Sequence, residues 1–381
     1  MEKLPSKFPN VIELSGKPYE RGYTYGSKSK KLIKKYLDVW FSWLSSVPPP
    51  DIPLTKDQAL NLSSKYLPYA MDYAPELVEE CHGISDGANI DFAEVFFINC
   101  SEDILDFIFA SLRWKYPTRG SSMKIWLPRP GCTTFMVSGK ATKSNGDVIM
   151  GQTFDMIHGE ALQESAVLLK IRPEKGPTSI NYSIAGVVGF NGLNSSGIGL
   201  VYNKIVTNDS GPGVPQPFMV RKALQQERIG DAVDSILNCK RASGSNHVVG
   251  DKNGEIFNVE CTATDHEVLI PLDGVVGHSN HIISERLKPF GIYAPDYTNS
   301  LLRWSRINKY LNDGKGEITV EDCKEWLKDH VNYPLSLCSH ERPPSEIKTM
   351  SGMIMLPKEL KILATYGNPC IQPYIEYQVP K

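Results

Sequence analysis

The sequence has 381 residues, enough to bury a sizeable core in one large domain or two medium ones. Its hydrophobic fraction of 41% and charged fraction of 22% are ordinary for a globular protein. The formal net charge of -2 argues against a dedicated binder of nucleic acid or anionic membrane, because either needs a surplus of lysine and arginine. The first residues contain no apolar signal segment, and the longest uncharged run, 182–203, is too rich in Gly, Asn and Ser to cross lipid. We therefore expect a cytoplasmic protein.

The cysteines are scattered along the chain and form no CxxC pair. Zinc sites and disulfide scaffolds usually show clustered or regular cysteine spacing. We therefore expect free thiols in a reducing compartment, with no metal ligands and no cofactor. The eight positions are Cys81, Cys100, Cys132, Cys239, Cys261, Cys323, Cys338 and Cys370.

The first ~115 residues read as mostly helical on hydrophobic periodicity. A short strand is expected over 11–14, followed by a helix within 19–44 that the three prolines at 48–50 end. A second helix should begin at Thr55, where Gln58 completes a capping box, and a third at Asp91 should run toward Trp114.

From Gly131 onward the pattern changes to period-2 runs rich in Thr, Val, Ile and Phe. Paired strands are expected at 133–138 and 148–154 around the turn signal at 144–147. Further strands are predicted at 166–171, 179–185, 197–203, 247–249, 255–260, 274–277, 349–356 and 361–366, and helices at 218–226, 231–238, 300–311 and 319–330. This order favours an α+β fold with helices layered on antiparallel sheets.

Cys132 heads the first strand of this sheet-rich part and directly follows Gly131. A single cysteine is more often a small buried hydrophobe than a nucleophile. The functional hypothesis is that the chain cuts itself before Cys132. A glycine leaves its carbonyl open to attack by the neighbouring thiol. The new α-amine, with a pKa of about 7.7–8.0, would then take the proton of the thiol without a histidine.

Asp155 is the candidate carboxylate for orienting this new amine, although it also reads as an ordinary strand-end aspartate. A tight two-residue turn at Asn145-Gly146 would place Asp155 opposite Met136, which is ~13 Å along the strand from Cys132. Bringing Cys132 and Asp155 together therefore requires a wider loop over 139–146 or a β-bulge.

The segment from His278 to His281 contains Asn280, whose side-chain amide is a candidate donor to a developing oxyanion. The same segment reads as a His-x-x-His metal pair, but a zinc site needs a third ligand and no partner motif is present. A second enzyme hypothesis is a papain-like Cys-His hydrolase with His278 or His281 as the base. A third is a non-catalytic binding protein that retains the fold.

Several short motifs, taken together in order and spacing, resemble the isopenicillin-N (acyl-CoA:6-aminopenicillanate) acyltransferase family of N-terminal-nucleophile cysteine hydrolases. The matching segments are 16–22 with Gly26, 91–95 with Asn99, 131–134, 145–146, 151–152 with Asp155, 189–191 through 202–203, 213–215, 278–281, Ser300 with Arg303, and 332–334 with Ser336 and Cys338. The chain departs from the family pattern at Thr153-Phe154, where Asn-Trp is common, and at Ser339, where an arginine often follows the late cysteine. A later Ser-Arg pair has no clean match.

The resemblance implies a four-layer αββα sandwich made as a precursor and cut between Gly131 and Cys132. The mature protein would be a heterodimer of a mostly helical segment 1–131 and a catalytic body 132–381, which together form one globular unit. The family's nucleophile, aspartate and oxyanion asparagine fall on Cys132, Asp155 and Asn280. We expect an amide hydrolase or N-acyltransferase acting on a small acyl amide or acyl donor, with no nucleic-acid or membrane partner. Hydrolysis is favoured because no nucleotide-binding feature for coenzyme A is evident.

Overall fold

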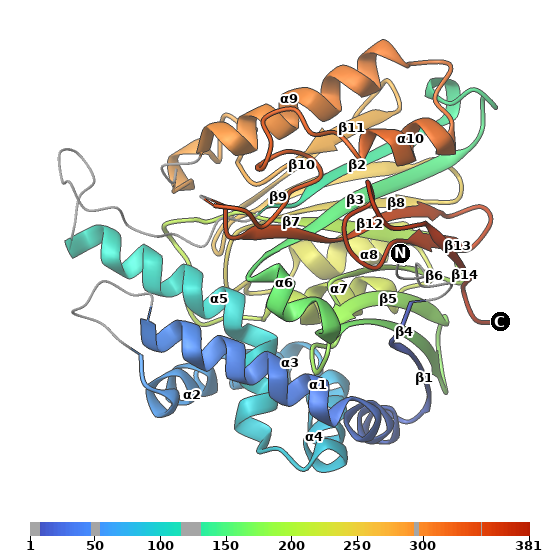
Figure 1. Ribbon diagram of the computed structural model, residues 1–381. Helices are drawn as coiled ribbons and strands as arrows, with labels where there is room; N and C mark the ends of the chain where they lie inside the picture. Colours follow the sequence, from blue (N-terminus) through green and yellow to red (C-terminus); the bar gives the residue numbers. More distant parts are fainter. Residues whose placement is uncertain (1–7, 47–53, 116–130, 293–296, 344) are drawn as a thin grey trace.

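The structure is a computed structural model that describes residues 8–46, 54–115, 131–292, 297–343 and 345–381 (Figure 1). Its strands are β1 (Val11–Gly16), β2 (Thr133–Ser138), β3 (Val148–Ile157), β4 (Ala166–Pro173), β5 (Ser179–Ile184), β6 (Asn191–Asn194), β7 (Ile198–Lys204), β8 (Ser245–Asp251), β9 (Ile256–Cys261), β10 (His266–Leu269), β11 (Val275–His278), β12 (Ile347–Leu356), β13 (Lys361–Ala364) and β14 (Ile375–Gln378). Its α-helices are α1 (Pro18–Ser46), α2 (Lys56–Ser64), α3 (Leu67–Tyr73), α4 (Pro75–Ala88), α5 (Phe92–Lys115), α6 (Gly159–Leu162), α7 (Gln216–Leu224), α8 (Ile229–Leu237), α9 (Tyr297–Asp313) and α10 (Val320–Trp326).

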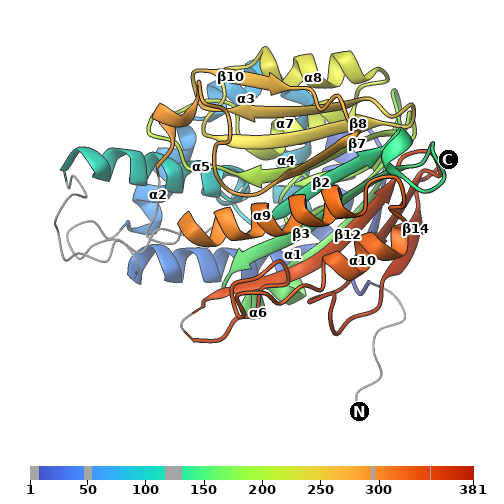
Figure 2. The ribbon, with the colours of Figure 1, turned by 90° about the horizontal axis from the view of Figure 1, so that it is seen from above.

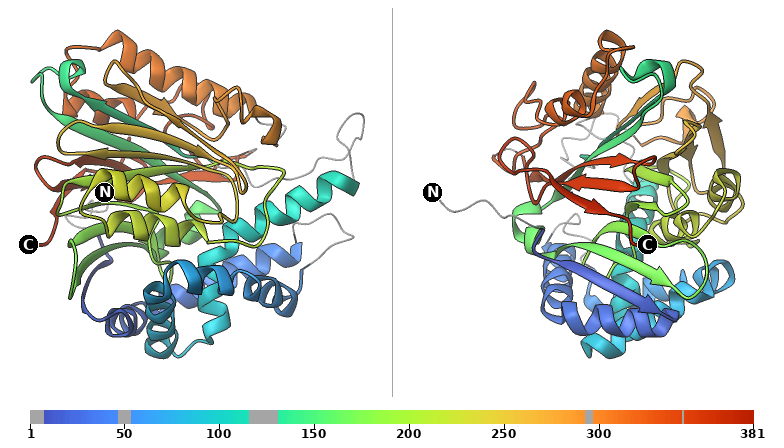
Figure 3. Two further views of the ribbon diagram at one scale, coloured as in Figure 1. Left: turned by 180° about the vertical axis from the view of Figure 1, so that it is seen from behind. Right: turned by 90° about the vertical axis from the view of Figure 1, so that its right-hand side faces the viewer.

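Two sheets packed face to face form the middle of the molecule. One has the strand order β1-β4-β5-β6-β7-β8-β9-β10 and the other the order β11-β2-β3-β12-β13-β14. Helices α9 and α10 cover the outer face of the six-stranded sheet, and Figure 2 shows them lying across β2, β3 and β12. Helices α7 and α8 pack on the eight-stranded sheet, with α1 to α5 on the same side of the molecule (Figures 1 and 3). This helix–sheet–sheet–helix order confirms the predicted αββα fold.

The two sheets interlock through methionines that rest on glycines. Met136 of β2 lies over Gly250 of β8, where a methyl group on the glycine would come 2.1 Å from the sulfur. Met150 of β3 lies in the same way over Gly199 of β7, at 2.5 Å. Because only glycine leaves room for these side chains, the two sheets approach closely at these points.

Strand β2 is buried on both faces, although Thr133, Thr134 and Ser138 are polar. Phe135 and Val137 belong to the core beneath α9 and α10, whereas Met136 belongs to the core between the sheets. Side chains alternate along a strand, so Cys132 and Thr134 share the inter-sheet face with Met136. The candidate nucleophile therefore lies at the end of a rigid strand inside the molecule.

Helices α1 and α4 touch backbone to backbone along a seam of glycines. A side chain at Gly22 would come 1.9 Å from the carbonyl oxygen of Glu80, and one at Gly83 would come 2.1 Å from that of Tyr19. Gly26 and Gly87, each one turn further along its helix, make equivalent contacts. These glycines cost helix propensity but allow the closest approach that two helices make.

A buried ion triad fixes the end of this seam. The carboxylate of Glu80, which is fully buried, accepts hydrogen bonds from Arg21 of α1 at 2.9 Å and from Arg221 of α7 at 3.0 Å. Burial alone would raise the pKa of the Glu80 carboxyl, but the two guanidinium groups lower it below its usual value. The triad thus joins the N-terminal helices to α7 of the sheet-rich body.

Most predicted elements are present, and the differences have structural causes. The bounds predicted for β2 are confirmed, as are both threonine caps, Thr55 before α2 and Thr319 before α10. Helices α3 and α4 and the four-residue strands β6, β10 and β14 were not predicted. The expectation of purely antiparallel sheets is wrong at one edge, because β1 pairs with β4 in parallel. Within the described ranges, no helix is long and apolar enough to cross a bilayer.

Candidate active site

Cys132 and Asp155 lie side by side at neighbouring strand ends. Strand β2 pairs with β3 from Thr133 opposite Thr153 to Ser138 opposite Val148. Extending this register by two residues places Gly131 opposite Asp155. The connection includes a 3₁₀ turn over Gly139–Ala141 rather than a tight two-residue hairpin. The predicted need for a wider loop is therefore confirmed, and the position opposite Met136 is wrong.

Gly131 is required where it stands because Asp155 fills the space beside it. A Cβ atom at residue 131 would lie 2.6 Å from the Cβ of Asp155 and 2.9 Å from its Oδ2. Real side chains do not approach so closely, so any larger residue would push the Asp155 side chain away. The sequence analysis predicted that this glycine leaves its own carbonyl open to attack. The structure adds a second reason, because only glycine fits beside the Asp155 carboxylate.

The thiol of Cys132 is buried and points toward the backbone of β3. Its side chain is 5% exposed, and its Sγ lies 3.8 Å from the carbonyl oxygen of Asp155. Burial raises the pKa of the Cys132 thiol to about 12, and the nearby Asp155 charge contributes to this shift. In the uncut chain the thiol is therefore protonated at neutral pH, and a nucleophilic role requires a base.

Asp155 is a buried carboxylate without a well-formed hydrogen bond. Neither of its side-chain oxygens has a partner of normal geometry in the described parts of the chain. Burial raises the pKa of the Asp155 carboxyl to about 7, against the lowering influence of Arg303 and of the hydroxyls of Thr349 and Ser339. A β-bulge in β12 faces this point, since Thr349 pairs with Asp155 but Ser351 pairs with Phe154. An unsatisfied buried carboxylate is costly, so its retention indicates a function.

Asn280 follows β11 and reaches the site through Arg303. Its side-chain oxygen accepts a hydrogen bond from Arg303 at 2.9 Å, and its amide nitrogen donates to the carbonyl of Lys204 at 3.0 Å. Arg303 of α9 also donates to the carbonyl of Cys132 at 2.6 Å and to the Thr133 hydroxyl at 3.0 Å. The structure thus brings Cys132, Asp155 and Asn280 into one cluster around a fully buried guanidinium.

Two residues of this cluster were given no role by the sequence. Arg303 supplies a buried positive charge beside Cys132 and Asp155. Asn203 of β7 donates to the carbonyl of Cys132 at 3.0 Å, while its own side-chain oxygen accepts from Thr134 at 2.6 Å. Both residues stand within segments that carry the family resemblance, but only the packing of β7 and α9 around β2 brings them to Cys132.

A small cavity of about 70 Å³ opens at Cys132. Its walls combine N-terminal helices with both sheets, through Trp40, Glu102, Leu105, Asp106, Phe154, Asp155, Met156, Ile157, Tyr202, Lys204 and Val206. Most of this wall is apolar. The charged end is organised by Lys204, which forms ion pairs with Asp106 at 2.9 Å and with Asp103 at 3.4 Å. The arrangement suits an apolar group beside the thiol and a polar group near Lys204.

The histidines of the 278–281 segment do not line this cavity. His278 contacts the Glu260 carboxylate and the carbonyl of Ser279, both at 2.6 Å, so both of its ring nitrogens are occupied. His281 contacts the Ser300 hydroxyl at 2.8 Å, and burial lowers the pKa of its imidazole to about 3. Among the described residues, neither histidine forms a hydrogen bond with the Cys132 thiol or lines its cavity, which disfavours the papain-like hypothesis.

Residues 141–370 match the family model of acyl-coenzyme A:6-aminopenicillanic acid acyl-transferase. The chain belongs to this family. The matched region contains Asp155 and Asn280 and begins shortly after Cys132. The family membership that the resemblance predicted is thereby confirmed.

Individual relatives are distant. The chain is 24% identical over 369 residues to the 40 kDa form of acyl-coenzyme A:6-aminopenicillanic-acid-acyltransferase of Emericella nidulans, covering 94% of this chain and 92% of that protein. It is 27% identical over 366 residues to an uncharacterized protein of Archaeoglobus fulgidus, covering 85% of this chain but only 58% of that longer relative. Among solved structures, a Caenorhabditis elegans N-acylethanolamine-hydrolyzing acid amidase ortholog aligns with a TM-score of 0.43 and 17% identity, over 60% of this chain and 93% of that one.

Proposed function

We propose that this enzyme is a self-processing cysteine amide hydrolase or acyltransferase whose nucleophile is Cys132. The observation that carries the proposal is the unsatisfied carboxylate of Asp155, which packs against Gly131. Gly131 directly precedes the buried thiol of Cys132. Besides the charge of Arg303, a carboxylate in this place is suited to a positive charge on residue 132, which the uncut chain lacks. Cutting the Gly131–Cys132 bond creates one there, the α-ammonium group of Cys132.

Self-cleavage would begin with attack of the Cys132 sulfur on the carbonyl carbon of Gly131. The thiol gives up its proton, the peptide C–N bond breaks, and the nitrogen leaves as the α-amine of Cys132. Water then hydrolyses the thioester, which releases the carboxylate of Gly131 and the free thiol. Asp155, with a pKa near neutrality, is suited to take the thiol proton in the first step. Arg303 and Asn203 hold the carbonyl of Cys132 and fix the backbone next to the reacting bond.

In the mature enzyme the α-amine would serve as the base for its own thiol. The thiolate attacks the carbonyl carbon of an acyl amide, and the proton passes to the leaving amine. The second hydrogen of the Asn280 amide is suited to stabilising the oxyanion. Water, or a second amine, then takes the acyl group from the thioester. Residues 1–131 and 132–381 would form the two subunits.

The substrate is proposed to be a small molecule with an apolar acyl group. Trp40, Leu105, Phe154 and Met156 form an apolar wall beside Cys132. Hydrolysis is favoured over transfer, because neither the sequence nor the cavity offers a recognisable phosphate-binding loop for coenzyme A.

The proposal is tested on purified full-length protein by intact mass and by a panel of acyl amides of increasing chain length. We expect two fragments that begin at Met1 and Cys132, amine release that increases with acyl length, and labelling of Cys132 by a thiol-directed acyl probe. An active preparation that consists only of the uncut chain would overturn the mechanism. An uncut, unlabelled and inactive protein would favour the non-catalytic alternative.

Asp155→Asn is expected to stabilise the uncut chain while preventing its maturation. Folding raises the pKa of this carboxyl to about 7 from an ordinary value of ~3.9, so the folded state binds its proton more tightly. The stability that this proton contributes is full below about pH 4 and is lost as the pH rises through about 7. In a Cys132→Ala background, urea unfolding at about pH 8 should therefore show Asp155→Asn more stable by about 2–4 kcal/mol, with little difference at about pH 4.

The exposed Asp147, in the loop after β2, supplies the matched control. Asp147→Asn should leave the free energy of unfolding unchanged within ~0.5 kcal/mol at both pH values. If Asp155→Asn destabilised the uncut chain at high pH, the carboxylate would have a stabilising partner before cleavage, and its proposed role would be wrong.

A further inference from the structure

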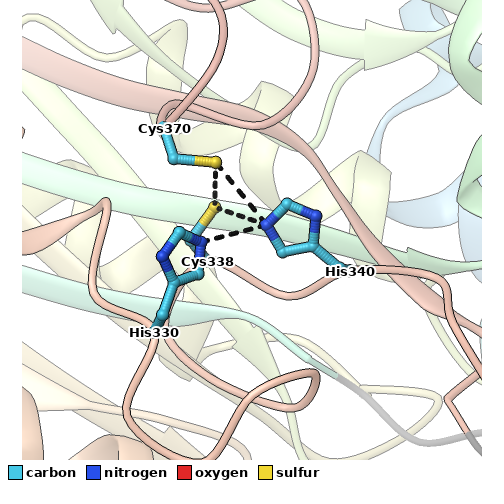
Figure 4. Close-up of side chains that lie close together, drawn as sticks. All are labelled: His330, Cys338, His340 and Cys370. Carbon is cyan, nitrogen blue, oxygen red and sulfur yellow. Dashed lines mark hydrogen bonds between the residues drawn. The ribbon is translucent and has the colours of Figure 1, made fainter.

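Four histidine and cysteine side chains outside the candidate active site converge on one point (Figure 4). His330, Cys338 and His340 come from the segment between α10 and β12, and Cys370 comes from the turn after β13. All four ligand atoms lie within 4.8 Å of one another. No sequence motif predicts this cluster, because 29 residues separate its last two members and none belongs to a CxxC or His-x-x-His motif.

We propose that His330, Cys338, His340 and Cys370 bind one zinc ion. With Zn–S of ~2.3 Å and Zn–N of ~2.0–2.1 Å, a regular tetrahedron has edges of about 3.3 Å between nitrogens, 3.6 Å between nitrogen and sulfur and 3.8 Å between sulfurs. The Nε2 atoms of His330 and His340 are 3.0 Å apart. The Nε2 of His340 lies 3.7 Å from the Sγ of Cys338 and 3.5 Å from that of Cys370, and the two sulfurs are 3.5 Å apart. These four distances thus approximate the edges of a zinc site.

The donor set selects zinc over the other common metals. Two thiolates and two imidazoles are softer ligands than magnesium or calcium prefer, and a tetrahedral S₂N₂ set is typical of zinc. Two thiolates also neutralise the charge of Zn²⁺, which suits the half-buried position of Cys370 and His340. Asn368 donates its side-chain N–H to the sulfur of Cys338 at 3.4 Å, as second-sphere partners of zinc thiolates do.

Four protein ligands leave no open coordination position, so the proposed site is structural rather than catalytic. Its place in the fold gives it a consequence for Asp155. Ser339 lies between the ligands Cys338 and His340 and forms two hydrogen bonds with Thr349. The backbone N–H of Ser339 donates to the Thr349 hydroxyl at 2.8 Å, and the backbone N–H of Thr349 donates to the Ser339 carbonyl at 3.0 Å. Thr349 pairs with Asp155 across β12 and β3. The ion would therefore hold the segment that packs behind the candidate carboxylate.

The proposal departs from our expectation of no metal ligands, and it has one chemical competitor. All eight cysteines are free, but the sulfurs of Cys338 and Cys370 are close enough for a small movement to join them in a disulfide of ~2.05 Å. A disulfide would consume both thiolates and exclude the zinc site. Intact mass separates the two, because the disulfide removes two hydrogens.

The experiment uses tag-free full-length protein from zinc-supplemented cells, purified with a reductant and without chelator, and measures metals by mass spectrometry. We expect about one zinc per chain in the wild type, and a loss of about tenfold in Cys370→Ser and in His330→Asn. Cys239→Ser, which alters a half-buried cysteine outside the cluster, should retain the metal. Replacement by cobalt should give the visible bands of tetrahedral Co²⁺ and a near-ultraviolet thiolate band, both absent from Cys370→Ser.

His330 is exposed, so His330→Asn tests the site without disturbing the core. Circular dichroism should show this variant folded, and a chelator should lower the unfolding midpoint of the wild type but not that of the variant. Wild-type protein with no more zinc than the two variants would overturn the proposal. So would a Cys338–Cys370 disulfide in metal-free protein isolated without reductant.

Discussion

Cys132→Ala is expected to leave a single uncut chain of 42.5 kDa with no measurable amide hydrolysis. The alanine has no sulfur to attack the carbonyl of Gly131, so neither the new N-terminus nor the nucleophile can form. Losing a covalent nucleophile typically lowers kcat by ~10⁴-fold or more. Intact mass and a sensitive amine-release assay measure both effects in one preparation.

Cys239→Ala is the matched control. Cys239 is also a free cysteine, but it lies after α8, where its sulfur donates to the carbonyl of Ile236 at 3.4 Å. This variant should mature fully and retain wild-type activity. A cut Cys132→Ala chain would show that another group performs the cleavage, and a cut Cys239→Ala chain with lost activity would point to a second essential thiol.

Glu80→Gln is expected to destabilise the protein by about 3–5 kcal/mol, the usual effect of removing one partner from a buried ionic group. Glutamine cannot neutralise Arg21 and Arg221, whose side chains are 4% and 2% exposed. The pKa of the Glu80 carboxyl is lowered in the folded state, so the contribution of the triad is present above pH ~4.3 and is lost as the pH falls further. Denaturant unfolding near neutral pH and in mild acid measures both expectations.

Glu79→Gln provides the comparison, since Glu79 is the exposed neighbour of Glu80 on α4. Its stability should stay within ~0.5 kcal/mol of the wild type, which removes any general effect of changing charge on this helix. Equal stabilities for the two variants would mean that the triad is energetically neutral. That result would mean that apolar packing alone holds α1, α4 and α7 together.

Local sequence predicted the elements whose signals are local. The caps at Thr55 and Thr319 and the alternating residues of β2 are examples. Helix α4 was not predicted, and its glycines are present for a reason that lies on another helix. Gly83 and Gly87 admit the backbone of α1, which no pattern within 75–88 reveals.

The site was predictable in its chemistry but not in its geometry. A thiol after glycine and a carboxylate after one hairpin are visible in the sequence, whereas their pairing depends on the width of the loop after β2. Arg303 lies 171 positions from Cys132, and only the packing of α9 onto β2 brings them together. The proposed zinc ligands could not be predicted for the same reason, because the segment with residues 330–340 and the turn with Cys370 come together only in the folded protein.

Strand β1 ends the eight-stranded sheet by pairing with β4, from Val11 opposite Leu168 to Gly16 opposite Pro173. If the chain is cut after Gly131 as proposed, this edge strand and the sheet beside it belong to different polypeptides. The uncut chain then folds in a unimolecular reaction, but the mature enzyme can reassemble only by collision of two fragments. Denaturation of the mature form should therefore become harder to reverse as the protein is diluted. The cut would make the folded structure, once it has formed from the single chain, difficult to regain after unfolding.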